Sequence, residues 1–144
     1  FAQPAGLKNE QKAELIKNIS VWFQLHHTEN FNLDDVARSH GLSHTMFFNE
    51  WKRHFNVSPV QYIIDLKLYS ASNLLMGTAL PIAEIVRKIN FSSPTAFYKR
   101  FFLKYGVSPG DFRKIFSGRQ QYFFHDVNEP VKLVEEYLAS RTKA

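Results

Sequence analysis

The amino-acid sequence predicts an all-α fold in which two helix-turn-helix subdomains are joined by a long helix, with extra helices at the N-terminal and C-terminal ends. Apolar side chains recur at the 3.6-residue spacing of amphipathic helices along most of the 144 residues. Helix-capping and turn-forming residues separate these segments. The residue pattern of 36–59 also returns about 50 residues later, over 85–109. A duplicated helical unit therefore underlies the predicted fold.

The N-terminal part, residues 1–32, is expected to hold a linker and one packing helix. Helical periodicity begins near Glu10 and ends near His26 and His27. The apolar stripe is broad, which favours a helix that packs against the rest of the domain. Its members are Ala13, Leu15, Ile16, Ile19, Trp22 and Phe23.

Residues 33–58 are expected to form the first helix-turn-helix. Asn32 can cap a short helix that ends at Gly41, because glycine adopts the positive φ of a tight turn without strain. Ser43 can cap the following helix, expected over 44–55. Its inward positions, at spacings of four residues, are Phe47, Trp51 and Phe55.

Residues 78–116 repeat this plan. Asn90 takes the turn position of Gly41, since asparagine tolerates positive φ, and the αL-tolerant residues Asn56 and Gly106 exchange in the same way at the helix ends. Ser93 and Pro94 provide an N-cap and an N1 proline for a helix to about Tyr105. The matching pairs are Val36 with Ile85, Arg38 with Arg87, Phe47 with Phe97, Trp51 with Phe101, Phe55 with Tyr105, and Val57-Ser58-Pro59 with Val107-Ser108-Pro109.

Residues 59–77 should form the joining helix. About 18 helical residues span ~27 Å, so the two units are expected to reach DNA segments ~34 Å apart, one turn of the duplex. The C-terminal extension, residues 117–144, should contain one helix over about 130–140. This helix either packs on the domain or contacts another chain.

The basic charge is confined to one region. The chain has a formal net charge of +5, and residues 81–116 carry seven basic against two acidic side chains, while the remaining parts are balanced. We therefore expect the second unit to supply most of a nonspecific attraction to phosphates. The basic residues are Arg87, Lys88, Lys99, Arg100, Lys104, Arg113 and Lys114.

Several classes of protein and site are excluded by what the sequence lacks. It has no cysteine, which excludes disulfides and thiolate sites and suits a reducing cytosol. It has no run of 18 apolar residues and no signal-peptide pattern at its start, and the absence of an initiator Met suggests part of a longer protein. Pairs such as His40 and His44 indicate polar helix ends rather than a metal site. We expect no catalytic residue, metal or cofactor.

The sequence resembles the AraC/XylS family of bacterial transcription regulators over about 33–116. That resemblance implies two helix-turn-helix units joined by a long helix, and a separate effector-binding or dimerisation domain upstream. The sequence departs from the family pattern at Lys67, where Arg is preferred, at Asn90, where Gly is usual, and at Phe102, where a basic residue is common. The family-like residues are Leu66-Lys67-Leu68, Ala71, Leu74-Leu75, Ile82-Ala83-Glu84-Ile85, Phe91-Ser92, Phe97, Phe101 and Gly106-Val107-Ser108-Pro109.

Helix geometry selects candidates for DNA contact in both units. Side chains opposite the inward aromatic residues point away from the core, and the resemblance implies the same positions as base or groove contacts. Asn49 can pair with adenine, Lys99 with guanine, and the Thr45 or Thr95 methyl can meet a thymine methyl. The full set is His44, Thr45, Phe48, Asn49, Lys52, Arg53, Pro94, Thr95, Tyr98, Lys99, Arg100 and Lys104.

Some of these candidates, and two further outward residues, Lys88 and Phe102, also have plainer interpretations. Arg53, Lys88, Arg100 and Lys104 are either phosphate contacts or solvated charges. Phe48, Tyr98 and Phe102 can instead be buried against a neighbouring helix, and for Phe102 burial is the interpretation that we favour.

The expected function is sequence-specific DNA binding in transcription regulation, at two adjacent major-groove segments, in the cytoplasm with the nucleoid. Expected partners are double-stranded operator DNA, RNA polymerase and the upstream domain, with no membrane. One alternative is a helical protein-interaction module that binds DNA weakly. A second alternative, an enzyme, would require a catalytic domain upstream of this chain.

Overall fold

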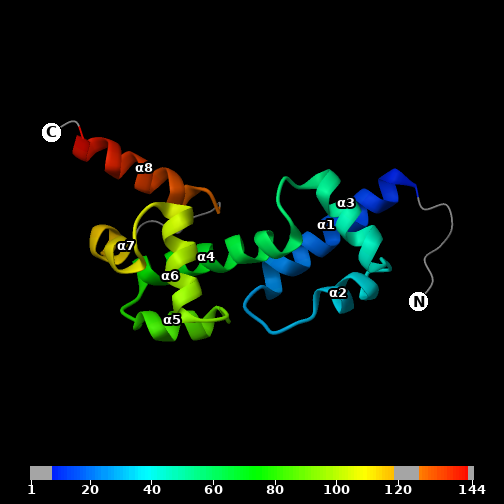
Figure 1. Ribbon diagram of the computed structural model, residues 1–144, viewed down its shortest axis with the longest axis horizontal. Coiled ribbons are helices and arrows are strands. Elements are labelled where there is room, and N and C mark those ends of the chain that lie inside the picture. The colour runs from blue at the N-terminus through cyan, green and yellow to red at the C-terminus, as the bar shows by residue number, and fades with distance from the viewer. Residues whose placement is uncertain (1–7, 119–126, 143–144) are drawn as a thin grey trace. The chain divides into compact units, whose positions relative to one another are not determined.

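A computed structural model describes residues 8–118 and 127–142 of the chain, and all regular structure in these residues is helical (Figure 1). The predicted all-α class is therefore confirmed. Expectations about the first seven residues and about 119–126 lie outside the described residues. The helices are α1 (Asn9–His26), α2 (Leu33–Ser39), α3 (His44–His54), α4 (Pro59–Gly77), α5 (Ile82–Lys88), α6 (Pro94–Tyr105), α7 (Pro109–Phe116) and α8 (Glu129–Thr142).

The chain divides into two compact units, residues 1–64 and 65–144, with the boundary inside α4. In the first unit α3 packs against α1, and the two run close together in Figure 1. Phe23 of α1 lies at the centre, with its ring 5.5 Å from Trp51 and 6.4 Å from Phe47. All three side chains are fully buried. The predicted inward face of the first packing helix is therefore confirmed.

The second unit is built around the aromatic face of α6. Phe97 and Phe101 are fully buried, and the ring of Phe101 lies 5.5 Å from that of Phe112 on α7. α8 packs on this unit through Pro130 and Val134. The C-terminal helix is longer than predicted, and its burial shows that it packs on its own domain. Contact with another chain remains a prediction.

The two turns are the same structure formed twice. Gly41 has a φ of 87° and Asn90 a φ of 56°, as predicted. The amide of Gly41 donates to the Arg38 carbonyl at 2.9 Å, and that of Asn90 donates to the Arg87 carbonyl at 3.0 Å. The next residues repeat the match, because Leu42 donates to Ala37 and Phe91 to Val86. The internal repeat in the sequence thus corresponds to repeated backbone hydrogen bonds.

The ends of α3 and α6 differ, which corrects part of the predicted repeat. Gly106 ends α6 in the left-handed conformation with a φ of 81°. α3 instead ends at His54, because Phe55 is extended with φ −128° and ψ 147°. Within the described residues Asn90 is the one non-glycine residue with positive φ, so Asn56 does not play the part of Gly106. The chain leaves α3 one residue earlier than the sequence pattern indicated.

Candidate nucleic-acid interface

The candidates of the first unit project from α3. Ser43 caps this helix by accepting the Met46 amide at 3.3 Å, which sets where the helix begins. The buried aromatic face of α3 then determines which positions remain outside. Thr45, Asn49, Lys52 and Arg53 are exposed, whereas Phe48 is half-buried.

His44 is held at the start of α3 by two neighbours. Its Nδ1 lies 2.6 Å from a carboxylate oxygen of Asp34 on α2. Its ring lies 4.5 Å from the ring of Phe48, one turn further along α3. These contacts orient both side chains before any ligand is present, although the pair with Asp34 is exposed and therefore weak.

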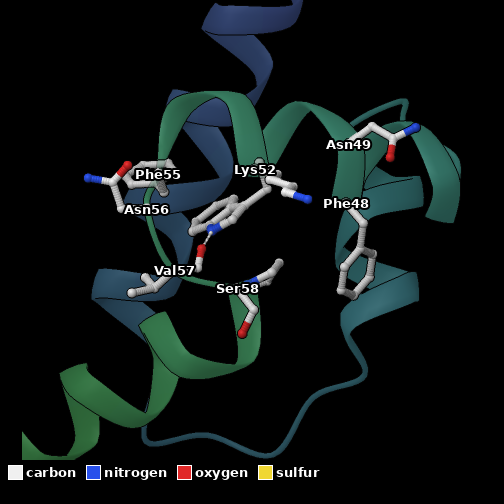
Figure 2. A pocket seen from close by; sticks show the side chains of 9 residues that line it. Phe48, Asn49, Lys52, Phe55, Asn56, Val57 and Ser58 are labelled. Atoms are coloured by element: carbon white, nitrogen blue, oxygen red, sulfur yellow. Dashed lines mark hydrogen bonds between the residues drawn. The ribbon is translucent and has the colours of Figure 1, made fainter.

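A depression of about 500 Å³ lies beside α3, where the chain turns into α4 (Figure 2). Asn49 and Lys52, two of the predicted DNA contacts, are among its lining residues, as are Asn56 and Ser58. The Trp51 indole N–H donates to the Val57 carbonyl at 3.1 Å, shown as a dashed line in Figure 2. This bond holds the segment after α3 against the helix. The depression thus adjoins the predicted DNA-facing surface of the first unit.

Arg53 belongs to a charge cluster around a buried carboxylate. Glu50 is only 6% exposed. Lys12, Arg53 and His54 each place a nitrogen 3.9 Å from its oxygens. A buried carboxylate requires such partners, so part of the Arg53 charge offsets Glu50 and is less available to DNA.

The candidates of the second unit project from α6. Ser93 caps the helix by accepting the Ala96 amide at 3.1 Å, and Pro94 occupies the first turn. Thr95, Lys99 and Arg100 are exposed, and Tyr98 is 43% exposed. Neither Lys99 nor Arg100 has an ion pair or hydrogen bond with any other residue in 8–118 or 127–142. Both cations are therefore available for contact with phosphates or bases.

Phe102 is not buried, contrary to the interpretation favoured from the sequence. It is 55% exposed, and its neighbour Leu103, which the sequence reasoning passed over, is 67% exposed. Phe97, Phe101 and Tyr105 form the buried face of α6, and helical spacing places Phe102 outside that face, where it stays exposed. Leu103 follows Thr95 and Lys99 at successive spacings of four, a signal that the sequence did contain.

Other basic side chains of the second unit are engaged within the protein. The Lys104 ammonium lies 3.5 Å from Asp65 of α4 and is only partly exposed. Arg87 pairs with Glu84 on α5. Arg113 donates to the backbone carbonyls of Leu75 at 3.2 Å and Thr78 at 3.3 Å. These contacts reduce the number of cations that the second unit offers to DNA, and Lys104 is the predicted contact most affected.

Lys67 supports the turn between α5 and α6. Its ammonium donates to the Asn90 carbonyl at 2.7 Å, and burial lowers the pKa of this ammonium below its ordinary value of 10.5. The bond reaches the residue that adopts positive φ. Lys67 is thus a structural residue of the second unit rather than a surface charge.

Histidines in the described part of the chain make local contacts. His26 pairs with Glu29, His40 Nδ1 lies 2.8 Å from the Val36 carbonyl, and His44 contacts Asp34. In the part of the chain that the structure describes, no three histidine or acidic side chains are placed to hold a metal ion. None of the helices in that part is long and apolar enough to span a lipid bilayer.

The sequence of this chain is similar to those of known helix-turn-helix proteins. A family of sequences described as a helix-turn-helix domain matches residues 36–115, which include α3, α4, α5 and α6. The lactose operon transcription activator of Staphylococcus xylosus is 27% identical over 117 residues, which are 81% of this chain and 40% of that protein. The Msm operon regulatory protein of Streptococcus mutans is 32% identical over 85 residues, 59% of this chain and 31% of that protein. The first relatives are thus longer proteins, of which the matches cover 40%, 42% and 36%.

Solved structures show the same fold. The DNA-binding domain of AdpA, a global transcriptional factor in complex with a target DNA, has a TM-score of 0.68 at 22% identity, covering 75% of this chain and 97% of that one. An AraC-type transcriptional regulator from Chromobacterium violaceum also has a TM-score of 0.68 at 22% identity, covering 76% and 98%. At this identity the likeness concerns the fold alone.

Proposed function

Because the chain belongs to the AraC-type helix-turn-helix family, we propose that it is the sequence-specific DNA-binding part of a bacterial transcription regulator. The observation that carries the proposal is the family match over 36–115, which includes both turns and both outward-facing helices, α3 and α6. One relative is named as an operon activator, and one solved neighbour is bound to its target DNA. DNA binding by this chain is inferred from these likenesses together with its own surface.

Four exposed side chains are proposed to read bases. In the first unit Asn49 forms paired hydrogen bonds with adenine, and in the second Lys99 donates to guanine O6 and N7. The methyl groups of Thr45 and Thr95 contact thymine methyl groups. Each good base contact discriminates by ~1 to 3 kcal/mol. Their exposure on α3 and α6 supports this assignment.

The remaining candidates are proposed to hold the DNA backbone or the edge of the groove. Lys52 and Arg100 are exposed and suit phosphate contact, whereas Arg53 and Lys104 are already close to Glu50 and Asp65 and should contribute less. The pair of His44 and Phe48, held by Asp34, is proposed to lie against the DNA at the start of α3. Pro94 and Tyr98 take the corresponding positions on α6.

At the level of the whole protein, we propose two adjacent major-groove contacts on one DNA molecule, one from each helix-turn-helix unit. The subdivision into 1–32, 33–58, 59–77, 78–116 and 117–144 is proposed on the same basis. A longer parent chain with an effector-binding or dimerisation domain, contact with RNA polymerase and a place at the nucleoid in the cytoplasm are further parts of the proposal. The greater length of the relatives supports the first of these.

The decisive experiment is selection of bound duplexes from a random pool, followed by measurement of Kd for the selected site by fluorescence anisotropy. Thr95→Ala and Lys99→Ala should each weaken binding to the selected site about thirtyfold, the middle of the range for one base contact, and leave the fold intact. Lys132→Ala, an exposed lysine of α8 outside the family match, is the matched control and should bind as the unmodified chain does. Absence of any preference over random duplex would reject the proposal.

A further inference from the structure

Near the C-terminal ends of their outward-facing helices, one unit has cationic side chains and the other has apolar side chains. In the repeat, Lys52 and Arg53 of α3 correspond to Phe102 and Leu103 of α6. Both members of each pair are exposed. Two cations in one unit thus stand where the other unit has two apolar side chains, on the same backbone plan.

Phe102 and Leu103 belong to the same exposed face as the proposed base contacts. Leu103 lies one turn beyond Lys99, which itself lies one turn beyond Thr95. Phe102 lies one turn beyond Tyr98, on the adjoining row. Their exposures of 55% and 67% exceed the 43% of Tyr98. Single exposed apolar residues are ordinary. Two neighbouring ones that extend the proposed binding face form an apolar patch of the kind that marks an interaction site.

We propose that Phe102 and Leu103 contact thymine C5-methyl groups in the major groove, so that the second unit reads thymine at the end of its site through apolar contact. The inference rests on the DNA-binding function proposed above. It adds two specificity-determining residues to that function, and it places an apolar contact where the first unit makes charged ones.

DNA is the occupant that the surrounding charges favour. Lys99 and Arg100 adjoin the pair on α6, and neither has a partner within 8–118 or 127–142. Two neighbouring cations with no partner in those residues repel most basic protein surfaces and attract the phosphates that border a groove. Within the major groove, the thymine methyl is the apolar group on the base edges, so it is the part of DNA that an exposed phenylalanine and leucine complement.

The test removes the methyl groups one at a time from the DNA. Each thymine of the selected site is replaced by deoxyuridine, which deletes the methyl and preserves base pairing. For the 144-residue chain, one or two thymines should lose about fourfold in affinity on replacement, the factor for one buried methyl-sized group. With Phe102→Ala or Leu103→Ala, binding to the thymine duplex should weaken by about the same factor. Replacement of the thymine that the substituted residue contacts should then cost nothing further.

Leu25→Ala provides the matched control, because Leu25 is 72% exposed on α1 and has no role in the proposed interface. This variant should retain both the affinity and the sensitivity to deoxyuridine. Thermal unfolding of all three variants checks that the fold is preserved, which their surface positions lead us to expect.

The outcomes separate the two proposals. Specific binding with the same deoxyuridine sensitivity in Phe102→Ala and Leu103→Ala as in the unmodified chain would overturn the methyl contact alone. Unchanged DNA affinity together with loss of self-association, measured by sedimentation, would assign the pair to a protein interface and also overturn it. If the unmodified chain showed no preference for any DNA sequence, the proposed DNA-reading function itself would be rejected.

Discussion

At the scale of single residues, the hydroxyl of Tyr105 in the second unit is unusual in its surroundings. It is buried, and in the described part of the chain it has no hydrogen-bond partner. Burial, and secondly the negative charge of Asp65, raise the pKa of this phenol well above its ordinary value of 10.0. The hydroxyl must therefore be neutral in the native packing. Because it is buried without a hydrogen bond, it contributes little to the free energy of unfolding.

Tyr105 should make the second unit sensitive to alkali. In the unfolded chain this tyrosine ionises near pH 10, whereas in the folded protein it remains neutral. The associated stability is thus fully present below about pH 10 and falls by ~1.4 kcal/mol per pH unit above it. Urea unfolding of Tyr105→Phe from pH 7 to 11 should show a shallower decline and at least equal stability at pH 7.

The control for this prediction is Tyr98→Phe, since the ring of Tyr98 is exposed on the outer face of α6. That variant should keep the pH profile of the unmodified chain. A profile of Tyr105→Phe that matches the unmodified chain throughout would show that Tyr105 does not govern the alkaline loss.

At the scale of elements, one side chain of α4 supports the turn before α6, the helix proposed to face DNA in the second unit. Asn90 adopts a φ of 56°, and its carbonyl accepts the Lys67 ammonium at 2.7 Å. The turn between α2 and α3 needs no such residue because Gly41 occupies it. The second turn is therefore the more strained of the two, and it is tied to α4.

Substitutions of Asn90 should distinguish the effect of its positive φ from the effect of its side-chain amide. Asn90→Ala should lower the free energy of unfolding by about 1 kcal/mol, because a Cβ without a local hydrogen-bonding group is disfavoured at positive φ. Asn90→Gly should not lower it, since glycine adopts this conformation freely. Chemical denaturation measures both changes.

Asn18→Ala, on an exposed site within α1, serves as the helical control and should not be destabilising. If Asn90→Gly were as damaging as Asn90→Ala, the asparagine amide itself would be the important group, and the account based on φ would be wrong.

At the scale of the whole molecule, the two units share a backbone plan but present different charges. Of the seven basic side chains in 81–116, Arg87, Lys104 and Arg113 are engaged by other groups of the protein. The excess of positive charge in this region is thus expected to attract DNA less strongly than the number of basic residues suggests. Lys99 and Arg100 remain as its outward cations on α6.

The salt dependence of DNA binding should still come mainly from the second unit. If three phosphates are neutralised, log affinity should fall against log salt with a slope of about −2.7, at ~0.9 per contact. Replacing Lys99 and Arg100 together by Ala should reduce the magnitude of that slope by more than about 0.9, because Arg100 is assigned to a phosphate and Lys99 brings a second positive charge into the groove. Titration of Kd between low and moderate salt measures it.

The matched double variant is Lys52→Ala with Arg53→Ala, where a smaller reduction is expected because Arg53 lies 3.9 Å from the buried Glu50. Equal reductions would refute the unequal division between units. Lys104 is unsuitable for charge reversal, because a carboxylate there would face Asp65 and perturb the fold.

Local sequence patterns were sufficient to predict most of the secondary structure. Ser43 and Ser93 begin helices by accepting backbone amides, and Asn90 and Gly41 adopt positive φ, as their chemistry indicates. The buried positions Phe47, Phe97 and Phe101 follow from helical spacing. These features depend on side chains and backbone within a few residues of one another, so the sequence alone determined them.

Other features were decided only by the tertiary structure. Phe102 lies outside the buried face of α6 that Phe97, Phe101 and Tyr105 form, so its burial depends on whether another segment covers it, and it is 55% exposed. The pairing of Lys104 depends on Asp65, nearly forty residues earlier in the chain, and the extended Phe55 depends on how the chain turns from α3 into α4. The sequence thus determined which helices form and which faces they present. Packing between segments distant in sequence decided which of those side chains remain free to bind, because burial and ion pairing require partners that local spacing does not identify.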